Sequence, residues 1–140
     1  MTFTVVVDVP APVGDVFDLL SDPGRRPEWQ SSLRRVVLLD DQPPRRGTRW
    51  YDVTVAGVRP LMEITQWQED RLWAERGTWR GISVELVLHF EARGEEARVT
   101  ADATTLAGGL LRPVGGLLDL FGPRTARREL DRAAAIVARI

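Results

Sequence analysis

The sequence predicts an α+β fold, in which a curved antiparallel sheet of about six to seven strands wraps around a long C-terminal helix. The segment Pro123–Ile140 predicts that helix, because its apolar residues recur at helical spacing at Ala126, Leu130, Ala133, Val137 and Ile140. A run of strand-like segments between residues 48 and 106 leaves no room for another helix, so neighbouring strands are expected to pair antiparallel. One or two short helices are expected after the first strand.

The first strand is expected at Thr2–Val9, which is rich in β-branched residues and ends at a proline. Apolar residues at helical spacing follow in Ala11–Ser21, and a Pro-Gly turn closes that helix. A second short helical turn is expected at Arg25–Trp29. The later strands are expected at Leu33–Leu39, Thr48–Ala56, Arg59–Trp67, Arg71–Thr78, Ile82–Ala92 and Ala97–Leu106.

Length and composition predict a single domain over residues 1–140, with an ordinary core. The net charge of −1 argues against nucleic acid as a partner. The chain has no cysteine and a single histidine, His89, so we expect no metal site and no cofactor. All 19 basic residues are arginine, which is typical of a GC-rich bacterial genome.

The expected location of the protein depends on its N-terminal segment and on its most apolar stretch. The N-terminal segment lacks the basic and apolar regions of a signal peptide. The segment Leu106–Gly122 is too short to span a bilayer and contains Arg112 and Asp119. We therefore expect a cytoplasmic protein without integral membrane association, either a monomer or a homodimer.

The last hairpin predicts the apolar inner face of the sheet. A turn at Arg93–Glu96 sets Ala92 opposite Ala97, and opposed residues share a face. One face of these strands is then apolar, and it consists of Ile82, Val84, Leu86, Leu88, Phe90, Val99, Ala101 and Ala103. We expect this face to be concave and buried under the C-terminal helix.

The middle strands allow two alternatives. With a turn at Trp79–Gly81, the inner face continues through Arg76 and, directly opposite it, Glu63, and it extends to Trp50, Asp52 and Trp67. Such a pair would be a structural ion pair or would orient the polar end of a ligand. A slip of one residue in the turn at Gln68 would instead put Met62, Ile64, Trp73 and Glu75 inside.

The order of motifs resembles the helix-grip fold of the START-like (SRPBCC) superfamily, in particular its bacterial polyketide cyclase/dehydrase-like members. The resemblance begins with the apolar strand, the helix start, the Asp-Pro turn and the tryptophan within Val9–Trp29. It continues in Gly47–Trp50 and in the hairpin Met62–Leu72, where Asp70 replaces the usual proline. The later hairpin motif is altered at Glu95–Thr100.

The resemblance implies a small hydrophobic ligand, such as a lipid or a polyketide-like molecule, in a cavity between sheet and C-terminal helix. We expect binding or transport rather than catalysis. The first alternative is an aromatase/cyclase-type enzyme with Asp52, Glu63 and Arg76 as candidate catalytic residues. The second is a protein-interaction module that uses the Arg-rich helix. The expected ligand-binding residues are Trp50, Asp52, Glu63, Trp67, Arg76, Val84, Leu86, Leu88, Phe90, Leu117, Phe121 and Leu130.

Overall fold

A computed structural model describes residues 2–107 and 122–139. Seven strands form one antiparallel sheet in the order β1-β7-β6-β5-β4-β3-β2. The strands span β1 Thr2–Val9, β2 Leu33–Leu38, β3 Arg49–Thr54, β4 Leu61–Gln68, β5 Leu72–Trp79, β6 Ile82–Arg93 and β7 Glu96–Ala107. The helices are α1 Val13–Leu20, the 3-10 turn η1 Pro23–Arg25, α2 Arg26–Trp29 and α4 Pro123–Val137. The predicted α+β architecture is therefore confirmed.

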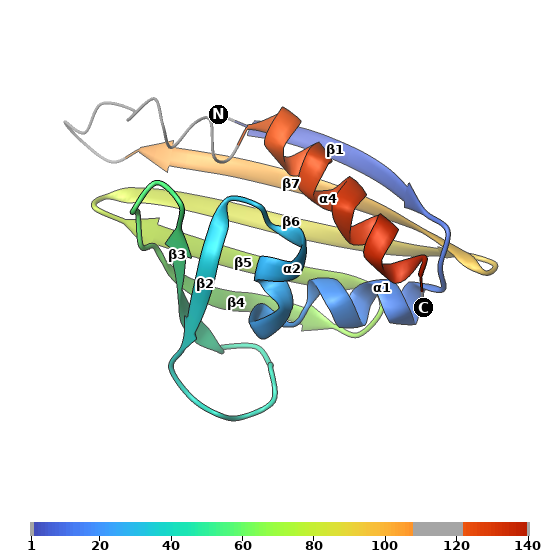
Figure 1. Ribbon diagram of the computed structural model, residues 1–140, viewed down its shortest axis with the longest axis horizontal. Helices are drawn as coiled ribbons and strands as arrows, with labels where there is room; N and C mark the ends of the chain where they lie inside the picture. Colours follow the sequence, from blue (N-terminus) through green and yellow to red (C-terminus); the bar gives the residue numbers. More distant parts are fainter. Residues whose placement is uncertain (1, 108–121, 140) are drawn as a thin grey trace.

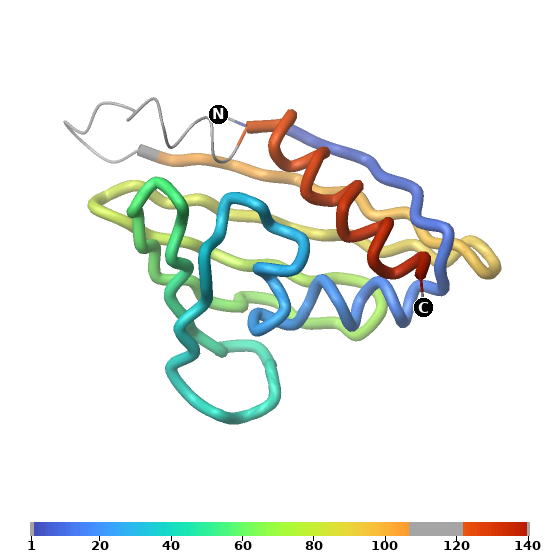
Figure 2. The backbone as a smooth tube through the Cα atoms, viewed as in Figure 1, coloured from blue at the N-terminus to red at the C-terminus, as the bar shows by residue number. Residues whose placement is uncertain are grey.

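The helices of the described residues cover one face of the sheet (Figure 1). The long helix α4 packs most closely on the edge strand β1, and it also contacts α1 and α2. The tube in Figure 2 shows the connection between β2 and β3 projecting away from this helical layer. The helix α4 thus lies over the β1 edge of the sheet, while α1 packs on β6 and β7 and α2 contacts β2 and α4.

The core forms where the concave face meets α1 and α4. Leu130, Ala133 and Val137 of α4 are buried there, as the helical spacing predicts. Phe17 of α1 packs edge-on against Phe90 of β6, with 5.0 Å between ring centroids. The last hairpin has the predicted register, with Ala92 opposite Ala97 and the apolar side chains inward. This end of the molecule is a packed apolar core.

The middle strands bury the alternative set of residues, although the slip that turns them inward lies in the β5–β6 turn rather than in the turn at Gln68. The β5–β6 turn contains only two residues, Arg80 and Gly81, and both have positive φ. Trp79 therefore lies opposite Ile82, one residue later than the three-residue turn predicts. A register shift between Ile64 and Gln66 adds a second irregularity in β4. Met62, Ile64, Trp73 and Glu75 are the buried residues, as the slipped register requires.

Candidate functional site

A partly open cavity of about 80 Å³ lies between the concave face and the helices. Its sheet wall is mostly aliphatic and includes Val84, Leu86, Leu88, Ala101 and Ala103, while α4 supplies Ala126, Glu129 and Leu130. The remaining lining residues are Phe3, Arg26, Trp29, Gln30, Ser32, Pro60, Met62, Glu75, Gly77, Trp79 and Ile82. Polar groups are thus confined to one part of an otherwise apolar wall.

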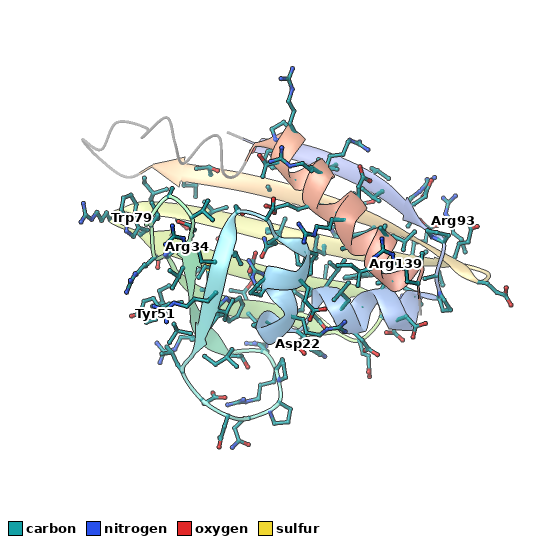
Figure 3. All side chains as sticks on the ribbon, viewed as in Figure 1. Asp22, Arg34, Tyr51, Trp79, Arg93 and Arg139 are labelled. Carbon is teal, nitrogen blue, oxygen red and sulfur yellow. The ribbon has the colours of Figure 1, made fainter. Side chains whose placement is uncertain are left out.

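The cavity is small because large side chains reach into it from the middle strands. Gly77 lies opposite Met62, and a Cβ atom at Gly77 would lie only 2.7 Å from the sulfur of Met62. The volume is about half that of an engineered apolar cavity of about 150 Å³ that binds benzene. Trp79 lies at the end of the β5–β6 hairpin, far from Arg93 at the other end of the sheet (Figure 3).

The polar part of the wall is built around Arg26. The side chain of Asp22 accepts a hydrogen bond from the amide of Gly24 at 3.0 Å and begins the turn that leads into α2. Arg26 and Trp29 lie three residues apart in α2, so both side chains point from one face of this short helix toward the sheet. Only 2% of Arg26 is exposed, an extreme value for an arginine.

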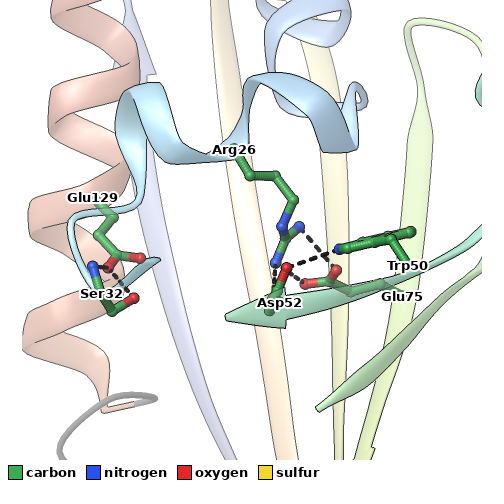
Figure 4. Close-up of polar contacts among 6 residues, drawn as sticks. All are labelled: Arg26, Ser32, Trp50, Asp52, Glu75 and Glu129. Carbon is green, nitrogen blue, oxygen red and sulfur yellow. Dashed lines mark hydrogen bonds and ion pairs between the residues drawn. The ribbon is translucent and has the colours of Figure 1, made fainter. Parts of the chain in front are cut away.

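Two buried carboxyl groups face this guanidinium from neighbouring parts of the sheet (Figure 4). Nη2 of Arg26 donates to Oδ2 of Asp52 at 3.2 Å and to Oε1 of Glu75 at 3.3 Å. Nη1 lies 2.9 Å from Oε2 of Glu75. Trp50 completes the cluster, because its Nε1 donates to Oδ1 of Asp52 at 2.8 Å. We call Arg26, Trp50, Asp52 and Glu75 the Arg26 cluster.

The Arg26 cluster is out of charge balance when both carboxyl groups are ionised. Burial raises the pKa of Glu75 to about 7, although the attraction of Arg26 lowers it, and the negative charge of Asp52 raises it further. Burial alone would lower the pKa of Arg26, but the two carboxylates outweigh that effect and raise it. The guanidinium also lies over the ring of Trp50, 5.3 Å from its centroid.

A third buried carboxyl group closes the cavity from α4. Glu129 is 5% exposed, and its Oε1 accepts hydrogen bonds from Oγ of Ser32 at 2.8 Å and from the Ser32 amide at 3.3 Å. Burial raises the pKa of Glu129, while the bonds from Ser32 lower it. Figure 4 shows this contact joining α4 to the segment after α2. Glu129 thus ties the helix to the polar side of the cavity.

Several polar atoms around the cavity lack a partner. Among the described residues, no hydrogen bond is made by Nε and Nη1 of Arg26, Nε1 of Trp29, Oε1 of Gln30 or Oε2 of Glu75. The contact between Arg26 Nη1 and Glu75 Oε2 is short, but the two groups are not aligned for a hydrogen bond. Buried polar groups are normally satisfied, so Nε of Arg26, Nε1 of Trp29 and Oε1 of Gln30, which have no ion-pair partner either, keep unmet hydrogen-bonding capacity next to the cavity.

The structure brings some of the expected site residues together. Val84, Leu86, Leu88 and Leu130 line the cavity, as the periodicity of the last strands and of the helix predicts. Trp50 and Asp52 are buried and belong to the Arg26 cluster behind it.

Other expected residues lie away from the cavity. Phe90 and Trp67 both pack on Phe17, in the core rather than on the cavity wall. Leu117 and Phe121 lie outside the described residues.

The prediction that Glu63 and Arg76 point inward is wrong. They do lie directly opposite each other, as predicted, but both side chains are exposed on the outer face. On the other neighbouring strand, β6, Arg76 lies opposite Glu85. Nε of Arg76 donates to Oε1 of Glu85 at 3.3 Å. The cause is the two-residue turn at Arg80-Gly81, since a shift of one residue moves every side chain of β5 to the other face.

Two polar residues of the cavity wall, Arg26 and Glu129, were not predicted from the sequence. Arg26 was available from its spacing to Trp29, because residues three apart share a face of a helical turn. Glu129 lies three residues after Ala126 and four before Ala133, so it belongs to the apolar stripe of the final helix. A charged residue inside such a stripe is a signal of a buried polar site.

The described residues contain no group of three or more acidic, histidine or cysteine side chains placed to hold a metal ion. Within the same residues, no helix is long and apolar enough to cross a membrane. The polar groups of the cavity-lining residues are the carboxyl groups of Glu75 and Glu129, the Arg26 guanidinium, the Gln30 amide, the Ser32 hydroxyl and two indole N–H groups. They can hold a polar group by hydrogen bonds, and Glu75, with a pKa of about 7, can exchange a proton near neutral pH.

The sequence also matches a known family over nearly its full length. The model of the family described as polyketide cyclase/dehydrase and lipid transport matches residues 1–139. The chain belongs to this family. No curated protein matches the sequence significantly.

Solved structures show the same fold at low identity. A START superfamily protein from Mycobacterium smegmatis superposes with a TM-score of 0.76 at 13% identity, over 99% of this chain and 97% of its own. The protein TTHA0849 from Thermus thermophilus superposes with a TM-score of 0.76 at 20% identity, over 99% of this chain and 98% of its own. DynU16, a putative protein of the dynemicin biosynthetic locus, superposes with a TM-score of 0.70 at 19% identity, over 98% of this chain and 47% of its own. The helix-grip fold of the START-like superfamily is thereby established for this member of the family.

Proposed function

We propose that the protein binds and carries a small hydrophobic molecule, of the lipid or polyketide-like class, in the cavity beneath α4. The single observation that carries this proposal is the asymmetry of the cavity wall. Aliphatic side chains of β6 and β7 line one part of it, and the buried polar groups of Arg26, Glu75 and Glu129 line another. An apolar pocket with a few convergent polar groups is the usual form of a small-molecule site.

The ligand-binding residues in this proposal are Val84, Leu86, Leu88 and Leu130 for the apolar part of the molecule. Arg26 and Glu75 hold its polar end. Asp52 accepts a hydrogen bond from Arg26, and Trp50 contacts both of these residues. With a volume of about 80 Å³, the cavity accepts a compact group, and a longer ligand extends through its open side. Family membership supports the same reading, because lipid transport is part of the family's description.

The test is native mass spectrometry of freshly purified protein, together with titration of a fluorescent apolar probe. Ala103→Leu places a larger side chain in the cavity, whereas Thr100→Leu makes the same kind of change on the opposite face of β7. Binding that is lost in Ala103→Leu and retained in Thr100→Leu supports the proposal. Binding that survives in both variants, or no bound molecule and no probe binding at all, contradicts it.

A second candidate function is acid–base catalysis, in line with the cyclase and dehydrase members of the family. Glu75 favours it, because this carboxyl group lines the cavity and its pKa of about 7 suits proton transfer near neutral pH. Arg26 beside it would stabilise a developing enolate oxygen. The assay is deuterium exchange next to the carbonyl of a small cyclic ketone such as 2-tetralone, followed by NMR. Exchange that the protein accelerates and Glu75→Gln abolishes supports catalysis, with the exposed Glu63→Gln as the control.

A further inference from the structure

We propose that the cavity selects a ligand whose polar end is an uncharged hydrogen-bond acceptor, a hydroxyl or a carbonyl group, and discriminates against ligands that end in a carboxylate or an ammonium group. This inference rests on the proposed binding function, because it specifies the ligand of the same site. It follows from two independent properties of the wall: its unpaired hydrogen-bonding atoms and its charge.

The unpaired atoms of the cavity-lining residues are mostly donors. Nη1 of Arg26 and Oε2 of Glu75 form an ion pair at 2.9 Å, which leaves two N–H groups, Nε of Arg26 and Nε1 of Trp29, and one acceptor, Oε1 of Gln30. The sixth unpaired atom among the described residues, Nε1 of Trp73, belongs to a residue that does not line the cavity. A ligand that satisfies this wall must bring acceptor oxygens, which an ammonium group lacks.

The charge of the wall disfavours ligands that end in a carboxylate, although a carboxylate is a strong hydrogen-bond acceptor. Among the buried residues that the structure describes, Arg26 carries the one positive charge. The carboxyl groups of Asp52 and Glu75 contact it, while the carboxyl group of Glu129 is bonded to Ser32; each of these four charged residues is at most 5% exposed. If Glu75 and Glu129 are both protonated, Asp52 still neutralises Arg26. If either of them ionises, the site becomes negative, so no protonation state with Asp52 ionised offers an anion a net positive charge.

A hydroxyl or a carbonyl group has the acceptor oxygen that an ammonium group lacks, and it does not carry the negative charge of a carboxylate. Its oxygen accepts from Arg26 or Trp29 without adding charge, and a hydroxyl also donates to Glu75 or Gln30. The rest of the ligand meets aliphatic side chains and the ring of Trp79; because the volume of about 80 Å³ is smaller than that of a cavity that encloses benzene, a ring occupies it in part and extends through its open side. A phenol-like or cyclic ketone end fits these conditions.

The experiment compares four probes with one common apolar part, by ligand-observed NMR titration of the purified protein at about pH 7.5, where the acid and the amine are charged. The probes are para-ethylphenol, para-ethylbenzoate, para-ethylbenzylamine and ethylbenzene. We expect para-ethylphenol to bind at least about tenfold more tightly than para-ethylbenzoate and para-ethylbenzylamine, and more tightly than ethylbenzene. The same order is expected in the control Glu63→Gln, whose substitution lies on the outer face.

The variants Glu75→Gln and Glu129→Gln test the electrostatic cause. Each removes one ionisable carboxyl group from the wall, so each should narrow the affinity gap between para-ethylphenol and para-ethylbenzoate. Tightest binding of the benzoate or the amine, or an unchanged gap in both variants, would overturn this inference. Equal binding of all probes, ethylbenzene included, overturns it too but leaves the binding function intact. Failure of every probe contradicts the binding function itself.

Discussion

The substitution Glu75→Gln tests whether burial, rather than attraction to Arg26, dominates the energetics of the Arg26 cluster. Glutamine has the shape of protonated glutamate and carries no charge. Arg26 keeps Asp52 as a partner in the variant, through the 3.2 Å contact of Nη2. The substitution therefore removes the uncompensated negative charge without leaving the guanidinium alone.

The magnitude follows from the raised pKa of Glu75, which is about 7 in the folded protein against an ordinary value of 4.5. At about 1.4 kcal/mol per pH unit, this difference corresponds to about 3 kcal/mol. Between these two pH values the folded protein holds a proton that the unfolded chain has released. The free energy of unfolding of the wild type therefore falls as the pH rises through this window, and it stays lowered above it.

We expect Glu75→Gln to match the wild type near the lower end of the window and to exceed it by up to about 3 kcal/mol above pH 7. The assay is urea unfolding followed by tryptophan fluorescence across this pH range. Glu129 also has a raised pKa, so the difference between variant and wild type, rather than either curve alone, isolates Glu75. The exposed Glu63→Gln should track the wild type throughout.

The opposite sign would refute the reasoning. Removal of one partner from a well-paired buried ion pair typically costs about 3–5 kcal/mol. If Glu75→Gln is destabilised by that amount above pH 7, ionised Glu75 is a net stabilising partner of Arg26, and the raised pKa is incorrect.

Three further predictions concern the same region. Arg26→Met should destabilise the fold by about 3–5 kcal/mol, because it leaves two carboxyl groups buried without a cation. The neighbouring Arg25→Met removes only an exposed contact and should cost less than about 1 kcal/mol. Urea unfolding of both variants measures the two losses. Ala103→Leu should fill the cavity and abolish probe binding without unfolding the protein, as circular dichroism would verify. Ser32→Ala should lower the free energy of unfolding by about 1–3 kcal/mol, since Glu129 loses its 2.8 Å hydrogen bond, and a smaller loss would mean that water replaces it.

The fold could be predicted from the sequence because its strongest signals are local. The helical spacing from Ala126 to Val137 identifies α4, and the alternation from Ile82 to Phe90 identifies the buried face of β6. The β6–β7 register was also predictable, since both strands alternate clearly around a single polar turn. In these segments the pattern and the turn support the same pairing.

The polar part of the site could not be predicted in the same way, because it depends on the position of one turn and on a bulge. The residues Trp79–Gly81 allow a turn of two or three residues, and the two choices put either Arg76 or Glu75 inside. The shift between Ile64 and Gln66 also reverses the facing of Trp67 relative to Glu63, which no simple alternation anticipates. Arg26 adds a long-range element, since its partners lie 26 and 49 residues away.

The Arg26 cluster is expected to serve selectivity rather than stability, and a triple substitution separates the two. Buried ion networks replaced together by apolar residues of similar size are often as stable as the original or more stable, whereas the loss of one member is costly. We therefore expect Arg26→Met combined with Asp52→Leu and Glu75→Leu to fold with at least the wild-type free energy of unfolding at neutral pH, unlike Arg26→Met alone. The same variant should lose most of the preference for para-ethylphenol over ethylbenzene, because it keeps Glu129 and the indole N–H of Trp29 but loses the guanidinium and the carboxyl groups of the Arg26 cluster. A triple variant that fails to fold would make the cluster a structural requirement, and one that prefers the phenol as strongly as the wild type does would remove the cluster from ligand selection.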